Sequence, residues 1–135
     1  MPTHTLKISS ACLLDDANRI LVVRKRGADL FILPGGKIEQ NETALEALLR
    51  ELQEEINVTL DSGQLAYLGR FQAQAANEPD HSVIAEIFIG RLTQPIEVQA
   101  EIETSGWTDL DSHNPEMLAP LLNEQVIPAL RNFLR

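Results

Sequence analysis

The stretch PGGKIEQNETALEALLRELQEEINV, residues 34–58, decides the fold and raises the main question about the sequence. Its second half carries four glutamates, and three of them, Glu51, Glu54 and Glu55, lie within five residues beside a single arginine, Arg50. If these residues end a helix, their negative charges oppose the helix dipole, whose C-terminal end is itself negative. A helix selected only for stability would carry lysine there, so the acidic cluster needs a further explanation.

The spacing of apolar residues predicts an amphipathic helix over residues 42–56. Asn41 is the expected N-cap, and Glu42 in the first turn suits the positive end of the helix. Asn57 is the expected C-cap, because asparagine tolerates the left-handed conformation in which many helices end. At about 100° per residue, a stripe of apolar side chains is expected to face the core: Leu45, Leu48, Leu49, Leu52 and Ile56.

The three glutamates occupy the neighbouring sector of the helix at spacing i, i+3, i+4, and Ala44 and Ala47 leave that sector uncovered in the earlier turns. A solvated polar face is the ordinary explanation, but Glu51 and Glu55 repel each other across one turn. A bound divalent cation reverses the argument, because clustered carboxylates then become ligands. Oxygen ligands without cysteine or paired histidine favour Mg²⁺, with Mn²⁺ as the alternative.

The rest of the chain has the pattern of strands followed by a closing helix. Residues 3–14 and 19–26 are strand-like and flank Asp15–Asn18, whose residue types suit a tight turn, so they predict a β-hairpin. Further strands, and a last helix that Pro128 kinks or divides, are expected in these ranges: 30–39 (a strand, then a glycine loop), 64–74, 82–92, 95–111 and 120–135. This order predicts an α/β fold with a mixed central sheet covered on both faces.

Composition limits the class of protein. The chain has 135 residues with 44% hydrophobic content, which fits a single domain over residues 1–135. Its formal net charge of −9 disfavours a nucleic-acid partner, since such proteins need a basic surface. No apolar run of about 20 residues and no export signal is visible, and a single cysteine fits a reducing compartment, so we expect a cytoplasmic protein without a membrane span. That cysteine, Cys12, is expected to be a small buried side chain.

With the preceding glycine included, the stretch resembles the Nudix box, whose pattern is Gly-x5-Glu-x7-Arg-Glu-U-x-Glu-Glu-x-Gly-U, where U is aliphatic. The matching residues are Gly36, Glu42, Arg50, Glu51, Leu52, Glu54, Glu55 and Val58. The late glycine is replaced by Asn57, which also tolerates a positive φ. The flanking segments, residues 19–39 and 101–111, also look like the family's strands. The resemblance implies an α/β/α sandwich that hydrolyses, with Mg²⁺, a nucleoside diphosphate linked to another moiety X.

The resemblance also implies roles for individual residues of the box. Glu51, Glu54 and Glu55 would hold the metal, together with the backbone carbonyl of Gly36. One glutamate would orient or deprotonate the attacking water. Glu54 is the first choice for this role and Glu51 the second.

The remaining residues of the motif are expected to support the site. Glu42 and Arg50 are expected to be structural, since an ion pair between them would tie the loop to the helix. Gly35 and Gly36 let the backbone approach phosphate or metal closely, and are assigned to substrate binding.

Candidates outside the box keep two explanations each. Arg24 and Arg26 are expected on the same side of a strand, where they either contact a substrate phosphate or are solvated. Glu86 lies among apolar neighbours on its strand face, and is either an additional metal ligand or a surface residue of an edge strand. Trp107 is expected in the core, with stacking on a base as the alternative.

Three function classes stay open at this stage. A pyrophosphohydrolase acting on a small nucleotide, such as a nucleoside triphosphate, agrees with every box residue. A non-catalytic nucleotide-sensing or interaction module on the same fold is the main alternative, although such modules typically lose box glutamates. An isoprenyl diphosphate isomerase would need a catalytic cysteine, and Cys12 lies too early in the chain. The sequence leaves the oligomeric state open, and homodimers are common in the family.

Overall fold

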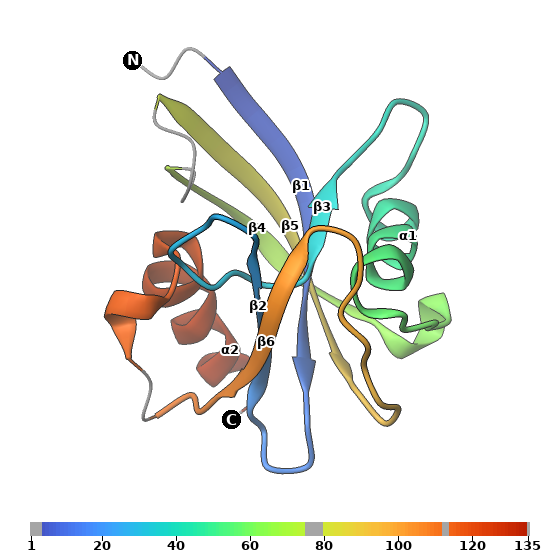
Figure 1. The fold of residues 1–135 in the computed structure, drawn as a ribbon, viewed down its shortest axis with the longest axis vertical. Helices are drawn as coiled ribbons and strands as arrows, with labels where there is room; N and C mark the ends of the chain where they lie inside the picture. Colours follow the sequence, from blue (N-terminus) through green and yellow to red (C-terminus); the bar gives the residue numbers. More distant parts are fainter. Residues whose placement is uncertain (1–3, 75–79, 112–113, 135) are drawn as a thin grey trace.

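In the computed structural model, which describes residues 4–74, 80–111 and 114–134, a six-stranded sheet lies between helices on its two faces. Figure 1 shows α1 on one side and α2 on the other. The strands are β1 His4–Leu14, β2 Ile20–Lys25, β3 Gly35–Lys37, β4 Ala66–Gln74, β5 His81–Arg91 and β6 Ile102–Thr108. The helices are α1 Ala44–Ile56, the short η1 Ser62–Gln64 and η2 Pro115–Met117, the π-helix η3 Leu121–Val126, and α2 Ile127–Phe133.

The sheet is mixed, as the sequence predicts. Its strand order is β4-β5-β1-β2-β6, with β3 paired to β1; the β1–β5 pair is parallel and the other pairs are antiparallel. The predicted hairpin is confirmed: Asp15 Oδ1 accepts hydrogen bonds from the backbone N–H groups of Ala17 and Arg19, at 3.0 and 2.8 Å. The turn therefore holds β1 and β2 together at the end where Leu14 pairs with Ile20.

β3 differs from the expectation of a strand followed by a glycine loop, because the glycines themselves form the strand. Gly35 pairs with Ser10 and Gly36 with Ser9. Gly35 has φ +145°, and a Cβ there would lie 2.2 Å from the backbone oxygen of Ser9. Only glycine permits β3 to lie so close to β1.

Alternating side chains of β1 fill two hydrophobic clusters, one on each face of the sheet. Ala11 and Leu13 pack in the cluster beneath α1, whereas Cys12 and Leu14 pack in the cluster beneath η3 and α2. The prediction that Cys12 is buried is confirmed, and burial raises the pKa of its thiol to about 12. Cys12 is therefore an inert core residue.

The start of α1 corrects the predicted cap. Thr43, not Asn41, is the N-cap: its Oγ1 accepts from the backbone N–H of Glu46 at 3.1 Å, and Glu46 Oε1 accepts from the backbone N–H of Thr43 at 2.8 Å. Asn41 has φ +69° and lies in the preceding turn. Both residue types suit a cap, but only Thr43 has a glutamate three residues later to close the capping box.

The rest of α1 follows the prediction. Asn57 is the C-cap, with φ 56° and ψ 40° in the left-handed region. Leu48, Leu52 and Ile56 are fully buried. Leu45 and Leu49 are partly buried at the margin of the same cluster.

The C-terminal segment divides at Pro128, one of the two predicted outcomes, since η3 ends at Val126 and Pro128 lies in the first turn of α2. Within the described residues, none of the helices has the length and apolar character that crossing a membrane requires.

Trp107 corrects a second expectation. It lies on β6, the last strand of the sheet order, and its side chain is 39% exposed rather than in the core.

Candidate active site

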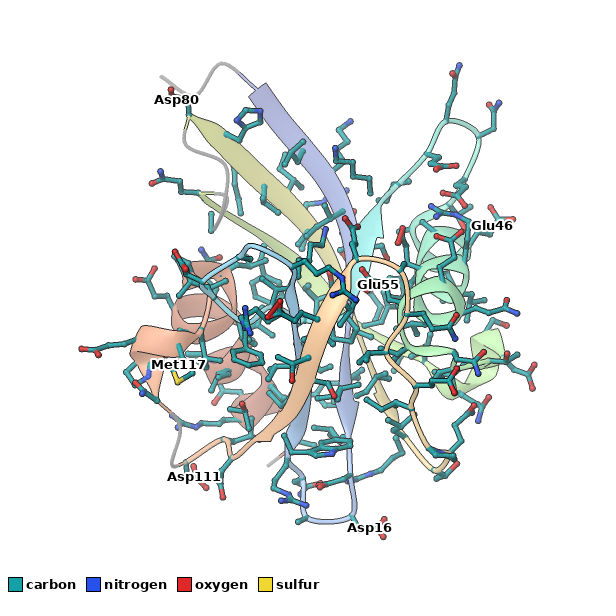
Figure 2. The ribbon with its side chains drawn as sticks, viewed as in Figure 1. Asp16, Glu46, Glu55, Asp80, Asp111 and Met117 are labelled. Atoms are coloured by element: carbon teal, nitrogen blue, oxygen red, sulfur yellow. The ribbon has the colours of Figure 1, made fainter. Side chains whose placement is uncertain are left out.

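The box glutamates of α1 face the two glycines of β3. Glu55 is only 3% exposed, and its Oε1 accepts a 3.0 Å hydrogen bond from the backbone N–H of Gly35. A Cβ on Gly36 would lie 2.4–2.6 Å from the carboxylate atoms of Glu51. Figure 2 shows Glu55 between α1 and the sheet, whereas Glu46 lies on the outer side of the helix. Two carboxylates therefore lie directly against the backbone of β3.

Burial dominates the electrostatics of this pair. It raises the pKa of Glu55 to about 7, with the neighbouring charge of Glu51 adding to the rise and the Gly35 hydrogen bond opposing it. Burial also raises the pKa of Glu51, against the attraction of Arg50. Desolvated adjacent carboxylates are costly when ionised, so the site favours a proton or a cation between them.

Arg50 ties the loop before α1 to the helix. Its Nε and Nη2 donate to the two carboxylate oxygens of Glu42 at 2.7 and 2.9 Å, and Nη2 also donates to the carbonyl of Lys37 at 3.1 Å. The hydrogen bonds from Arg50 hold the pKa of Glu42 at about 2. This geometry is the one expected for a structural pair, because guanidinium and carboxylate meet through two parallel contacts.

Replacing Arg50 with lysine tests this role. Lysine keeps the charge but loses the two-pronged contact. We expect Tm to fall by roughly 3–6 °C, and kcat/KM to fall about tenfold because the segment that follows Gly36 loses its anchor. Thermal unfolding and steady-state kinetics measure both effects. Arg91→Lys, an exposed arginine beside the β1–β2 turn, is the control, and an unchanged Tm in Arg50→Lys would contradict the structural role.

The third box glutamate is placed differently. Glu54 is 56% exposed in its side chain, and Arg50 Nη1 lies 3.1 Å from Glu51 Oε2 and 3.5 Å from Glu54 Oε2. Across residues 4–74, 80–111 and 114–134, no three His, Cys, Asp or Glu side chains are arranged to hold a metal ion as they stand. The guanidinium of Arg50 contacts both Glu51 and Glu54.

The residues nevertheless fit a divalent cation. The donors are all oxygens, two of the carboxylates are desolvated, and the missing Cβ of Gly36 lets the Glu51 carboxylate lie against the backbone of β3. Hard cations such as Mg²⁺ prefer this donor set.

Lys25 and Glu101 lie at the same site, and the sequence analysis did not predict either of them as a site residue. Lys25 Nζ lies 3.5 Å from Glu101 Oε1. The charge of Lys25 lowers the pKa of both Glu51 and Glu55, while that of Glu101 raises the pKa of Glu55. A β-bulge between Arg24 and Lys25 re-aims the end of β2, and no residue pattern in the sequence reveals it.

Arg24 and Arg26, which the sequence analysis assigned to substrate binding, differ in their surroundings. Arg24 donates to Glu103 at 2.7 Å and to the carbonyl of Ala28 at 3.0 Å, and its guanidinium lies over the ring of Phe31. Arg26 is exposed and follows the end of β2, so the two do not share a strand face. Their assignment to substrate binding stays a prediction.

Glu86 occupies an interior strand, because β5 lies between β4 and β1, so the edge-strand alternative is wrong. Its carboxylate accepts hydrogen bonds from Tyr67 Oη at 2.6 Å and from Arg70 Nε and Nη2 at 3.1 and 2.8 Å. These bonds, chiefly that of Arg70, lower the pKa of Glu86. Its predicted role as a metal ligand stays a prediction, and both oxygens already have partners.

A cavity of about 200 Å³ opens beside the glycines on the opposite face of the sheet from α1. Its walls are mainly apolar and include Ile8, Leu33 and Leu122, with Lys25 and Gly36 at the side nearest the carboxylates. Lys25 therefore lines the cavity and also acts on the charges of the site. The cavity and the acidic cluster are two parts of one candidate active site.

Comparison with known proteins agrees with this arrangement. The sequence model of the NUDIX domain family matches residues 5–130 of this chain. The 8-oxo-dGTP diphosphatase of Escherichia coli (strain K12) is 29% identical over 133 residues, which cover 95% of this chain and 98% of that protein. The RNA pyrophosphohydrolase of Halorhodospira halophila is 46% identical over 55 residues, which are 41% of this chain and only 29% of that protein's length.

Solved structures share the fold. The MutT protein from Methanosarcina mazei Go1 superposes with a TM-score of 0.80 at 19% identity, covering 100% of this chain and 99% of that chain. The family model spans nearly the whole sequence, including the glycines of β3 and the glutamates of α1. The chain therefore belongs to the Nudix hydrolase family.

Proposed function

We propose that this protein is a Mg²⁺-dependent pyrophosphohydrolase that cleaves a pyrophosphate bond in a small nucleotide, with nucleoside triphosphates as the leading substrate class. The observation that carries the proposal is the pair of desolvated carboxylates, Glu51 and Glu55, held against the glycine backbone of β3. Such a pair favours a cation, and a cation there can bind a diphosphate.

Glu51, Glu54 and Glu55 would hold the metal together with the carbonyl of Gly36. Bound Mg²⁺ would offset the charge of the diphosphate and lower the pKa of a coordinated water. Glu54 is exposed and lies 3.5 Å from Arg50, and it is our first choice for orienting or deprotonating the attacking water; Glu51 is the second. Glu101 is a further carboxylate within electrostatic reach of Glu55.

Lys25 would contact a phosphate oxygen, since it lines the cavity and its charge also acts on Glu51 and Glu55. The cavity has the volume and apolar lining for a nucleobase rather than a whole nucleotide. The relative from Escherichia coli that covers nearly the whole chain is named for 8-oxo-dGTP, which makes an oxidised guanine nucleotide the first substrate to test.

The deciding experiment is a substrate panel with Mg²⁺ that measures release of phosphate or pyrophosphate. It includes 8-oxo-dGTP, the ordinary nucleoside triphosphates, ADP-ribose, nucleotide sugars, dinucleoside polyphosphates and a short RNA with a 5′-triphosphate. We expect the triphosphates to be hydrolysed best. Preference for the RNA would indicate a substrate like the one for which the RNA pyrophosphohydrolase relative is named. No release from any substrate would favour the non-catalytic alternative.

Metal binding should depend on pH because the metal competes with a proton on Glu55. The pKa of this group is about 7 in the folded protein without metal, against an ordinary value of 4.5. Between these values the folded state holds the extra proton, so stability falls as pH rises, by at most about 1.4 kcal/mol per pH unit. Mg²⁺ favours the ionised form, so its stabilising effect should increase with pH.

Thermal unfolding at about pH 6 and about pH 8, with and without Mg²⁺, measures this coupling across the pKa of Glu55. We expect the rise in Tm on adding Mg²⁺ to be clearly larger at the higher pH. Glu55→Gln, which cannot titrate, serves as the control and should lose most of the pH dependence. An equal Mg²⁺ effect at both pH values in the wild type would contradict this prediction.

A further inference from the structure

A row of residues in register crosses four neighbouring strands from the candidate metal site toward the edge of the sheet. Gly36 of β3 pairs with Ser9 of β1, Ser9 pairs with Glu86 of β5, and Glu86 pairs with Arg70 of β4. Because adjacent strands lie about 4.8 Å apart, Glu86 is roughly 10 Å from Gly36. Figure 1 shows β3, β1, β5 and β4 lying side by side in this order.

The side chains of this row lie on the face of the sheet that α1 covers. Ala11 and Leu13 of β1, and Phe88 of β5, pack in the cluster beneath α1. Since side chains alternate along a strand, Ser9 and Glu86 point to that same face. The row therefore lies on the same face of the sheet as the contact between Glu51 and Gly36.

Arg70 is held in place at the outer end of this row. Glu86 accepts from its Nε and Nη2, and Tyr67 Oη donates to the other carboxylate oxygen. Glu86 is thereby paired on both oxygens, while the side chain of Arg70 stays 69% exposed. A guanidinium has five N–H donors, and Nη1 of Arg70 has no hydrogen-bond acceptor among the described residues. A fixed, exposed guanidinium with donors left over is suited to an anion.

The row between Arg70 and Gly36 contains a side chain with unused hydrogen-bonding capacity. Ser9 is fully buried, and its Oγ has no partner in the part of the chain that the structure describes. A buried hydroxyl without a partner is costly, and bound water or ligand commonly satisfies such groups in binding sites. Ser9 lies directly between Gly36 and Glu86, which places this capacity on the line from the carboxylates to Arg70.

We infer that Arg70, positioned by Glu86 and Tyr67, binds a phosphate group of the substrate distant from the metal-bound diphosphate, so that the phosphate chain lies along this row. The inference rests on the proposed function, in which Mg²⁺ held by Glu51, Glu54 and Glu55 binds a diphosphate. It assigns Glu86 to holding Arg70 rather than to the metal. It also indicates that a longer phosphate chain binds better than a shorter one.

Calorimetric titration of inorganic tripolyphosphate and pyrophosphate, each with Mg²⁺, tests the inference without requiring hydrolysis. We expect Arg70→Ala to weaken tripolyphosphate binding about tenfold or more, the loss typical of a charge-assisted hydrogen bond, and pyrophosphate binding much less. Arg19→Ala is the matched control, because Arg19 also makes a close ion pair with a carboxylate, Asp15, but at the β1–β2 turn. This control should bind both anions as the wild type does.

The outcomes separate the two proposals. Equal tripolyphosphate affinities for Arg70→Ala and Arg19→Ala, or no binding of either anion by the wild type, would overturn the inference. Glu86→Gln should leave Mg²⁺ affinity in the absence of anion unchanged, and a clear loss would return Glu86 to the metal ligands. If Arg70→Ala loses tripolyphosphate but the wild type hydrolyses no nucleotide, the phosphate subsite survives and the proposed function fails.

Discussion

Gly36→Ala is expected to lower kcat/KM by about a hundredfold or more while leaving the protein folded. The added Cβ would lie 2.4–2.6 Å from the carboxylate of Glu51, so that carboxylate must move by an ångström or more. Displacements of about 1 Å at a reacting centre commonly cost a factor of about 10² in rate. The clash is with the end of a flexible side chain, which can turn away, so we expect a modest change in Tm.

Two glycine variants make this prediction specific. Gly106→Ala is the control, because a Cβ there meets nothing within 4 Å and its activity should match the wild type. Gly35→Ala should fail differently, by loss of stability, since its Cβ would meet the Ser9 backbone oxygen at 2.2 Å and its φ is +145°. Circular dichroism and kinetics on all three variants distinguish the cases. Full activity in Gly36→Ala would mean that Glu51 does not act at this position.

Glu51→Gln and Glu54→Gln are expected to produce the largest losses of kcat, on the order of 10²–10⁴, the range contributed by general acid–base catalysis. Glutamine nearly preserves shape but neither accepts a proton nor offers a charged ligand. If Glu54 is the base, its variant should lose kcat with little change in Mg²⁺ affinity. Glu51 is desolvated beside Gly36, so its variant should weaken Mg²⁺ binding as well.

The readouts are kcat as a function of Mg²⁺ concentration, and Tm to verify that each variant folds. The matched control is Glu116→Gln, an exposed glutamate on η2, which should keep full activity. Unchanged phosphate or pyrophosphate release in both box variants would remove the assignment of these glutamates. A loss of activity at Glu54 that high Mg²⁺ restores would make Glu54 a ligand rather than the base.

Local patterns made much of the fold predictable. The apolar stripe of α1 and the left-handed cap at Asn57 depend on residues within one or two turns of each other. The hairpin follows from turn residues between two strand-like runs. The wrong N-cap came from two suitable residues close together, and the capping-box glutamate at position 46 distinguishes Thr43 from Asn41.

The placement of the site depended on contacts between distant segments. The sequence indicated the box residues, but not that β3 would bring Gly35 to Glu55 and Gly36 to Glu51. Lys25 lowers the pKa of Glu51 and Glu55 from a point where the register of β2 shifts, and no sequence pattern reveals that shift. Trp107 is exposed because its strand lies at the edge of the sheet, a position that its residue type does not reveal.

The sequence by itself determined the helix, the chemistry of its acidic sector and the family resemblance, because these rest on residue types at fixed short spacings. The tertiary structure alone decided which carboxylates are desolvated, which cation lies beside them and that Glu86 holds Arg70. Strand pairing joins residues far apart in the chain, and burial and charge depend on that pairing. No short pattern in the chain contains this information.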